Sequence, residues 1–175
     1  MFFQPKPIDL GFMSAIASFY VVPGDRLTDI VAAATPAPGG WFRPARDNFP
    51  GVLRSSGREL ETFAWSGWAF ATFDLYLESR HGFMYVDFGD AVASRQLSQV
   101  RGSDWLVLPA ESAVRLLAAL DGIEGEASEV TAFIVSEHGP DEAAQEAVAV
   151  QAALTTLKGW LAELSPGSVG LLSIG

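Results

Sequence analysis

Residues 14–22 read SAIASFYVV, and this stretch sets the first element of the fold. Its residues are small or apolar, several of them are β-branched or aromatic, and the stretch ends at Pro23-Gly24, a pair typical of turns. The pattern predicts a buried strand. Residues 25–34 follow with an aspartate suited to cap a helix and with apolar side chains at helical spacing, up to the Pro- and Gly-rich break at 36–40. A strand and a short helix therefore open the domain.

The rest of the chain carries further helix and strand patterns, and residues 91–101 are ambiguous between helix and loop. The helix at 66–80 is apolar most of the way round, which predicts a buried core helix. Short apolar runs bounded by turns predict the strands. The predicted helices are 49–56, 66–80, 109–120, 126–137 and 140–164, and the predicted strands are 83–88, 105–108 and 169–174.

This order of elements predicts an α+β fold with a single domain over residues 13–175. We expect a small mixed sheet with several helices packed on it, and a long C-terminal helix followed by a terminal strand. Residues 1–12 are expected to form a loose N-terminal extension. At 175 residues and 49% hydrophobic content, the chain is long enough to bury a substantial core.

The composition excludes several kinds of site. There is no cysteine, so disulfides, thiol nucleophiles and thiolate metal sites are ruled out. The two histidines, His81 and His138, each precede a glycine, which is typical of helix C-termini. The acidic residues lack the spacing of a calcium-binding loop. We therefore expect no metal and no cofactor, and we interpret Asp87-Phe88-Gly89, a match to a kinase motif, as chance because the other kinase motifs are missing.

The net charge of −10 is unevenly distributed. Residues 116–157 carry eight acidic side chains and no lysine or arginine. Such a surface repels nucleic-acid phosphates and attracts a basic protein partner. The alternative is a solvated acidic face that only keeps the protein soluble. Nucleic-acid binding is accordingly not expected.

Signals for a membrane location are weak. The longest early uncharged stretch, residues 10–24, has 15 residues, which is too short to span a bilayer. Prolines and an aspartate precede it, and no cleavage site for a signal peptide follows. We expect a cytoplasmic protein without membrane association.

The segment 59–68, ELETFAWSGW, is the strongest candidate for recognition. It contains Trp65 and Trp68 and follows Arg54 and Arg58, and both residue types are frequent at binding hot spots. The alternative is that the two tryptophans anchor the core helix. From these residues and from the acidic run we select the candidate binding residues Arg54, Arg58, Trp65, Trp68, Glu124, Glu126 and Glu129.

Three stretches together resemble the YfbM-like family, a bacterial family of unknown function. They are MSAIASFYVVPGDRLTDIVAA (13–33), WSGWAFATFDLYL (65–77) and SDWLVLPAESAVRLLAAL (103–120). The resemblance covers about two-thirds of the chain and is one of layout, with no counterpart for residues 43–58 or the acidic run. It implies an α+β fold and no established activity, so it assigns no site residues.

The leading hypothesis is a non-catalytic protein-binding module that uses its acidic side or an aromatic-rich cleft. An immunity or antitoxin-like role is one version of it. The alternative is a small-molecule-binding protein or a hydrolase-like enzyme with a site near Arg54, Arg58, Trp65 and Asp87. A homo-oligomer, in which a self-interface explains the charged fraction of only 18%, is a third hypothesis.

Overall fold

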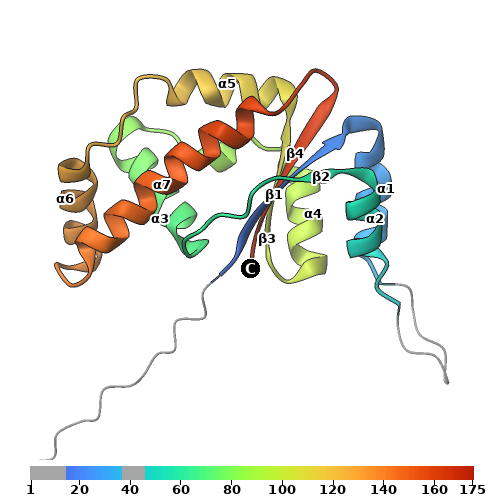
Figure 1. Cartoon of the computed structure of the whole chain (residues 1–175), viewed down its shortest axis with the longest axis horizontal. Coiled ribbons are helices and arrows are strands. Elements are labelled where there is room, and N and C mark those ends of the chain that lie inside the picture. Colours follow the sequence, from blue (N-terminus) through green and yellow to red (C-terminus); the bar gives the residue numbers. More distant parts are fainter. Residues whose placement is uncertain (1–14, 37–45) are drawn as a thin grey trace, which may run out of the picture.

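The computed structural model describes residues 15–36 and 46–175 (Figure 1). At its centre lies a four-stranded sheet with the order β2-β1-β4-β3. The terminal strand β4 is thus an inner strand, and it pairs with β1 along its whole length. The strands are β1 (Ala17–Pro23), β2 (Arg58–Glu59), β3 (Asp104–Pro109) and β4 (Ser168–Ile174).

Helices cover both faces of this sheet. In Figure 1, α3, α5, α6 and α7 lie on one side of it, and α1, α2 and α4 lie on the other. The helices are α1 (Leu27–Ala34), α2 (Phe49–Ser56), α3 (Trp68–His81), α4 (Ala91–Arg101), α5 (Ala110–Leu120), α6 (Ala127–His138) and α7 (Ala143–Ala162), with 3₁₀ turns η1 (Gly24–Arg26) and η2 (Tyr85–Phe88). The predicted α+β class, with a long C-terminal helix followed by a strand, is confirmed.

Alternation along the strands gives the molecule two hydrophobic cores. Phe19 and Leu172 point to the larger core, beneath α3, α5 and α7. Val22, Val107 and Leu171 point to the smaller core, beneath α1, α2 and α4. Because successive side chains of a strand face opposite sides, β1, β3 and β4 each supply both cores.

Two expectations about strands are wrong. The sheet is not mixed, since all three strand pairings of the described residues are antiparallel. The segment 83–88 is not a strand: it contains the 3₁₀ turn η2. The carboxylate of Asp74, on α3, accepts a hydrogen bond from the backbone N–H of Tyr85 at 2.6 Å, which takes a donor that a sheet would need.

The helix boundaries differ from prediction by at most three residues, and α2 has the predicted bounds, 49–56. α3 begins at Trp68 rather than next to Ser66, although the Ser66 hydroxyl still accepts from the Trp68 N–H at 3.4 Å. α7 begins at Ala143 rather than Pro140, because Glu142 adopts a left-handed backbone with φ of 61°. The ambiguous segment 91–101 is a helix.

The predicted core helix, α3, buries one side only. It buries seven of its 14 residues, whereas its Trp68 and Leu75 are exposed; the longer helix α7 buries nine of its 20 residues. The predicted extension, residues 1–12, lies outside the described residues. None of the helices in the described part of the chain is long and apolar enough to cross a membrane.

Candidate functional site

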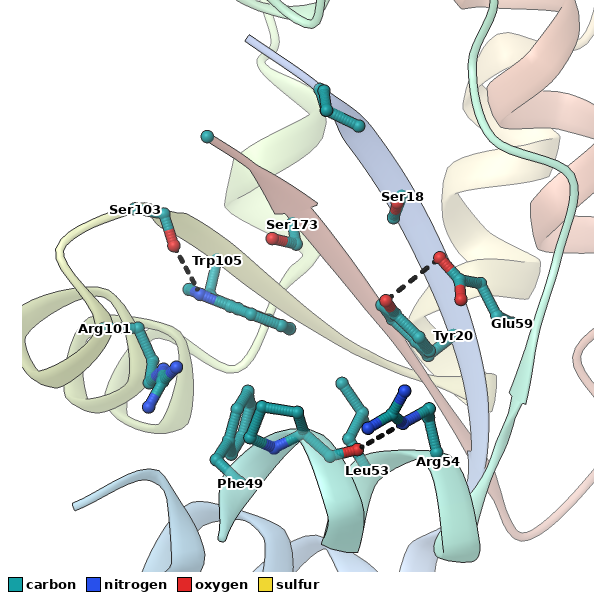
Figure 2. A pocket seen from close by; sticks show the side chains of 13 residues that line it. Ser18, Tyr20, Phe49, Leu53, Arg54, Glu59, Arg101, Ser103, Trp105 and Ser173 are labelled. Atoms are coloured by element: carbon teal, nitrogen blue, oxygen red, sulfur yellow. Dashed lines mark hydrogen bonds between the residues drawn. The ribbon is translucent and has the colours of Figure 1, made fainter. Parts of the chain in front are cut away.

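A cleft of about 360 Å³ opens on the sheet face that carries α2 and α4 (Figure 2). Its floor comes from three neighbouring strands. Ser18 on β1 lies opposite Ser173 on β4, and Ser173 lies opposite Trp105 on β3. The strand register therefore places these three side chains in one row across the sheet.

The cleft exists because the side chains on this face of the sheet change from apolar to polar along the strands. Further along the same face, Val22, Leu171 and Val107 are buried in the smaller core. In the row of Ser18 and Ser173, hydroxyl side chains that are only half-buried replace them. Serine loses little by staying hydrated, so this end of the face does not require a helix to cover it.

One wall of the cleft is formed by Arg101, whose charge is neutralised by Asp47. The two terminal nitrogens of Arg101, the last residue of α4, donate to the two carboxylate oxygens of Asp47 at 3.1 and 2.9 Å. These hydrogen bonds hold the pKa of Asp47 below its ordinary value. The guanidinium carbon also lies 4.5 Å from the centre of the Phe49 ring. Arg101 is therefore a structural clamp between α4 and the start of α2.

The other wall carries two opposite charges around Tyr20. The Tyr20 hydroxyl donates to a carboxylate oxygen of Glu59, on β2, at 3.0 Å. Arg54, on α2, donates through Nε to the Pro50 carbonyl at 3.1 Å and forms no ion pair with any described residue. Burial, and then the hydrogen bond to Glu59, raise the pKa of Tyr20. The arginine and the carboxylate are both exposed and thus accessible to a ligand.

The structure separates the sequence-predicted site residues. Arg54 lines the cleft, whereas Arg58 points to α7 and pairs with Glu163 at 2.8 Å beside a different hollow. Trp68 lines a third hollow, with Ile174 and Ser103. Asp87 belongs to the turn η2. Arg54, Arg58 and Trp68 thus line three different hollows.

The two predicted tryptophans do not anchor a core. Trp65 is 39% exposed and Trp68 is 53% exposed. Among the tryptophans in residues 15–36 and 46–175, the buried one is Trp160, on α7, with 5% exposure. Both predicted tryptophans therefore remain available for contact.

The acidic run lies mainly at the end of the molecule formed by α6 and its flanking turns (Figure 1). Glu124 and Glu126 lie in the α5–α6 connection, and Glu129 lies in the first turn of α6; all three are exposed. Of the eight acidic residues, Glu146 alone has an ion-pair partner among the described residues, namely His138 at 3.2 Å. The charge at this end is consequently not neutralised within the described chain.

Two further titratable side chains with shifted pKa values, Asp74 and Tyr85, are buried in the protein interior. Asp74 is 5% exposed, and burial raises its pKa to about 7 against the opposing effect of its backbone hydrogen bonds. The nearby negative charges of Asp87 and Glu78 raise it further. Burial also raises the pKa of Tyr85. Within residues 15–36 and 46–175, no group of three histidine or carboxylate side chains is placed to hold a metal ion.

Four residues that line the cleft with Arg54 were not predicted from the sequence: Ser18, Tyr20, Trp105 and Ser173. Glu59 was included only as part of the segment 59–68. A signal was present in the alternation of two strands. In SFYVV and in VGLLSI, one face changes from apolar residues to serine near the strand end. Only the pairing of β1 with β4 aligns the two serines.

Comparison of the chain with protein-family models, with curated proteins and with solved structures gave no match. The fold is α+β, and the cleft that opens on it has the sheet as its floor.

Proposed function

We propose that this protein is a non-catalytic protein-binding module whose acidic end engages a basic protein partner. The observation that supports it is the set of seven acidic residues within 116–157 that are exposed and lack an ion-pair partner among the described residues. Unneutralised charge of one sign accelerates the encounter with a partner of opposite sign.

A toxin-neutralising role is one version of this proposal. Enzymes that act on nucleic acids present basic surfaces to bind phosphates, and an acidic protein is complementary to such a surface. The meeting would take place in the cytoplasm, where we expect the protein to reside.

The test uses the full-length protein as bait at low salt, with bound proteins eluted by increasing salt. The variant Glu126→Gln/Glu129→Gln/Glu137→Gln removes three charges from α6 and its approach. The matched control, Asp25→Asn/Glu61→Gln/Glu111→Gln, removes three exposed charges elsewhere and changes the net charge equally.

The proposal expects a partner that is retained by the control and lost by the α6 variant, with binding that weakens as salt screens the charges. Equal retention by both variants, or equal loss from both, would show that the acidic end has no specific role. Eluted proteins with no excess of basic residues would also contradict the proposal.

A further inference from the structure

The cleft of Figure 2 is separate from the acidic end, and its residues point to a ligand of their own. It lies on the α2 and α4 face of the sheet, whereas α6 belongs to the other side (Figure 1). Its volume of about 360 Å³ falls near the lower limit for small-molecule pockets, which are roughly 300–1,000 Å³. The occupant must therefore be small.

The charged wall indicates the polar part of that ligand. Arg54 and Glu59 both lie close to Tyr20 and are not paired with each other. The Nε of Arg54 donates a hydrogen bond to the Pro50 carbonyl, which holds the guanidinium in place. The terminal nitrogens of Arg54 remain as donors for a ligand. Glu59 accepts one hydrogen bond from Tyr20 and keeps further acceptor capacity. One end of the cleft thus offers a cation and an anion at once.

The part of the floor that β3 supplies indicates the apolar part of the ligand. The ring of Trp105 is half-buried, and its Nε1 already donates to Ser103 at 2.9 Å, so it presents mainly its aromatic surface. Phe49 packs edge-on against it at 5.4 Å between ring centres, which fixes its orientation. Between Trp105 and the charged wall, the hydroxyls of Ser18 and Ser173 form the polar part of the floor.

We propose that this cleft binds a free α-amino acid with a large apolar or aromatic side chain. Its carboxylate binds the guanidinium of Arg54, its ammonium group binds the carboxylate of Glu59, and its side chain packs against Trp105. A ligand with only one of the two charges leaves either the arginine or the glutamate without a partner, and binds more weakly.

The experiment is calorimetric titration of the full-length protein with phenylalanine, leucine and tryptophan, and with two analogues of phenylalanine. Phenethylamine lacks the carboxylate, and 3-phenylpropionate lacks the ammonium group. Three variants are compared: Arg54→Gln, Glu59→Gln, and Ser173→Phe, which fills the floor. Arg80→Gln and Glu111→Gln, at exposed positions outside the cleft, are the matched controls. Thermal unfolding confirms that each variant is folded.

We expect phenylalanine to bind the wild type and the two controls, and to bind at least about tenfold more weakly to Arg54→Gln and to Glu59→Gln. Arg54→Gln should leave phenethylamine binding unchanged, and Glu59→Gln should leave 3-phenylpropionate binding unchanged. Ser173→Phe should abolish binding of all three compounds.

Three results would overturn the proposal. The first is no binding of phenylalanine, leucine or tryptophan at millimolar concentration. The second is undiminished binding to folded Ser173→Phe, which would place the site elsewhere. The third is 3-phenylpropionate binding as tightly as phenylalanine, which would make the cleft a carboxylate site and exclude a role for Glu59.

Discussion

At the scale of single residues, Asp74 shows how burial and hydrogen bonding compete. Its side chain, on α3, accepts a hydrogen bond from the backbone N–H of Tyr85, the first residue of the turn η2. Burial raises its pKa from 3.8 to about 7, even though hydrogen bonds to the charged form lower it. Because of this burial, the Asp74 carboxyl group stays protonated to higher pH in the folded state than in the unfolded state.

The first prediction follows from this pKa. The unfolded chain releases the Asp74 proton near pH 4, whereas the folded chain keeps it to about pH 7. The folded state holds the extra proton within this window, so its stability falls as pH rises from about 4 to about 7 and then levels off. The two pKa values differ by about three, which corresponds to about 4 kcal/mol.

The measurement is urea unfolding of the wild type and of Asp74→Asn across this pH range. The variant should gain stability relative to the wild type as pH rises, by up to about 4 kcal/mol. Asp87→Asn, which removes a neighbouring negative charge, should move the change to lower pH. Parallel pH profiles for the wild type and Asp74→Asn would contradict the raised pKa.

At the scale of elements, α4 closes the outer edge of the sheet. The N–H of Trp105 donates to the Ser98 hydroxyl, and the N–H of Val107 donates to the Ser94 hydroxyl, both at 2.9 Å. The Val107 carbonyl accepts from the Asp90 N–H at 2.8 Å. The two serines are four residues apart, so they lie on one face of α4. These hydrogen bonds satisfy backbone groups of the edge strand β3 that would otherwise be open to pairing with another chain.

The second prediction concerns this edge. Ser94→Ala/Ser98→Ala leaves two backbone donors without their partners, and we expect a loss of about 1–3 kcal/mol for each. Urea unfolding measures the loss, and light scattering during size exclusion should detect concentration-dependent association through the exposed edge. Ser136→Ala is the control, because its hydroxyl bonds to the Phe133 carbonyl within α6. If the double variant is as stable and as monodisperse as this control, α4 does not protect the edge.

Prediction from sequence also worked best at the scale of elements. The periodicity of apolar residues located α1, α2, α3, α5, α6 and α7 to within a few residues, because it depends on neighbours along the chain. It failed at 83–88, where FMYVDF fits a strand, since the deciding contact comes from Asp74 on another element. The two-residue strand β2 was also missed, because so short a pairing leaves no pattern of its own.

At the scale of the whole molecule, one aromatic stack ties three elements together. The Trp160 ring on α7 stacks on Phe19 of β1 at 5.3 Å and on Phe70 of α3 at 5.6 Å between ring centres. The stack joins residues from the first strand to the last helix of the domain, so it depends on the complete fold. Trp68, by contrast, is 53% exposed.

The third prediction compares these two tryptophans. Trp160→Ala should destabilise the protein by about 3–5 kcal/mol, because it leaves a cavity at the centre of the larger core. Trp68→Ala should change stability by no more than about 0.5 kcal/mol, since it alters an exposed side chain. Chemical unfolding followed by circular dichroism measures both. Similar losses in the two variants would contradict the assignment of Trp160 as the core tryptophan.

The sequence by itself determined the α+β class, the order of most elements and the excess of acidic residues in 116–157, because these properties reside in local periodicity and in composition. Only the tertiary structure decided that β4 lies between β1 and β3, that Trp160 is buried in the core, and that Ser18, Ser173 and Trp105 share one row. The pairing of strands about 150 residues apart depends on the sum of contacts over the whole chain, which no local pattern records. The resemblance to the YfbM-like family stays a prediction.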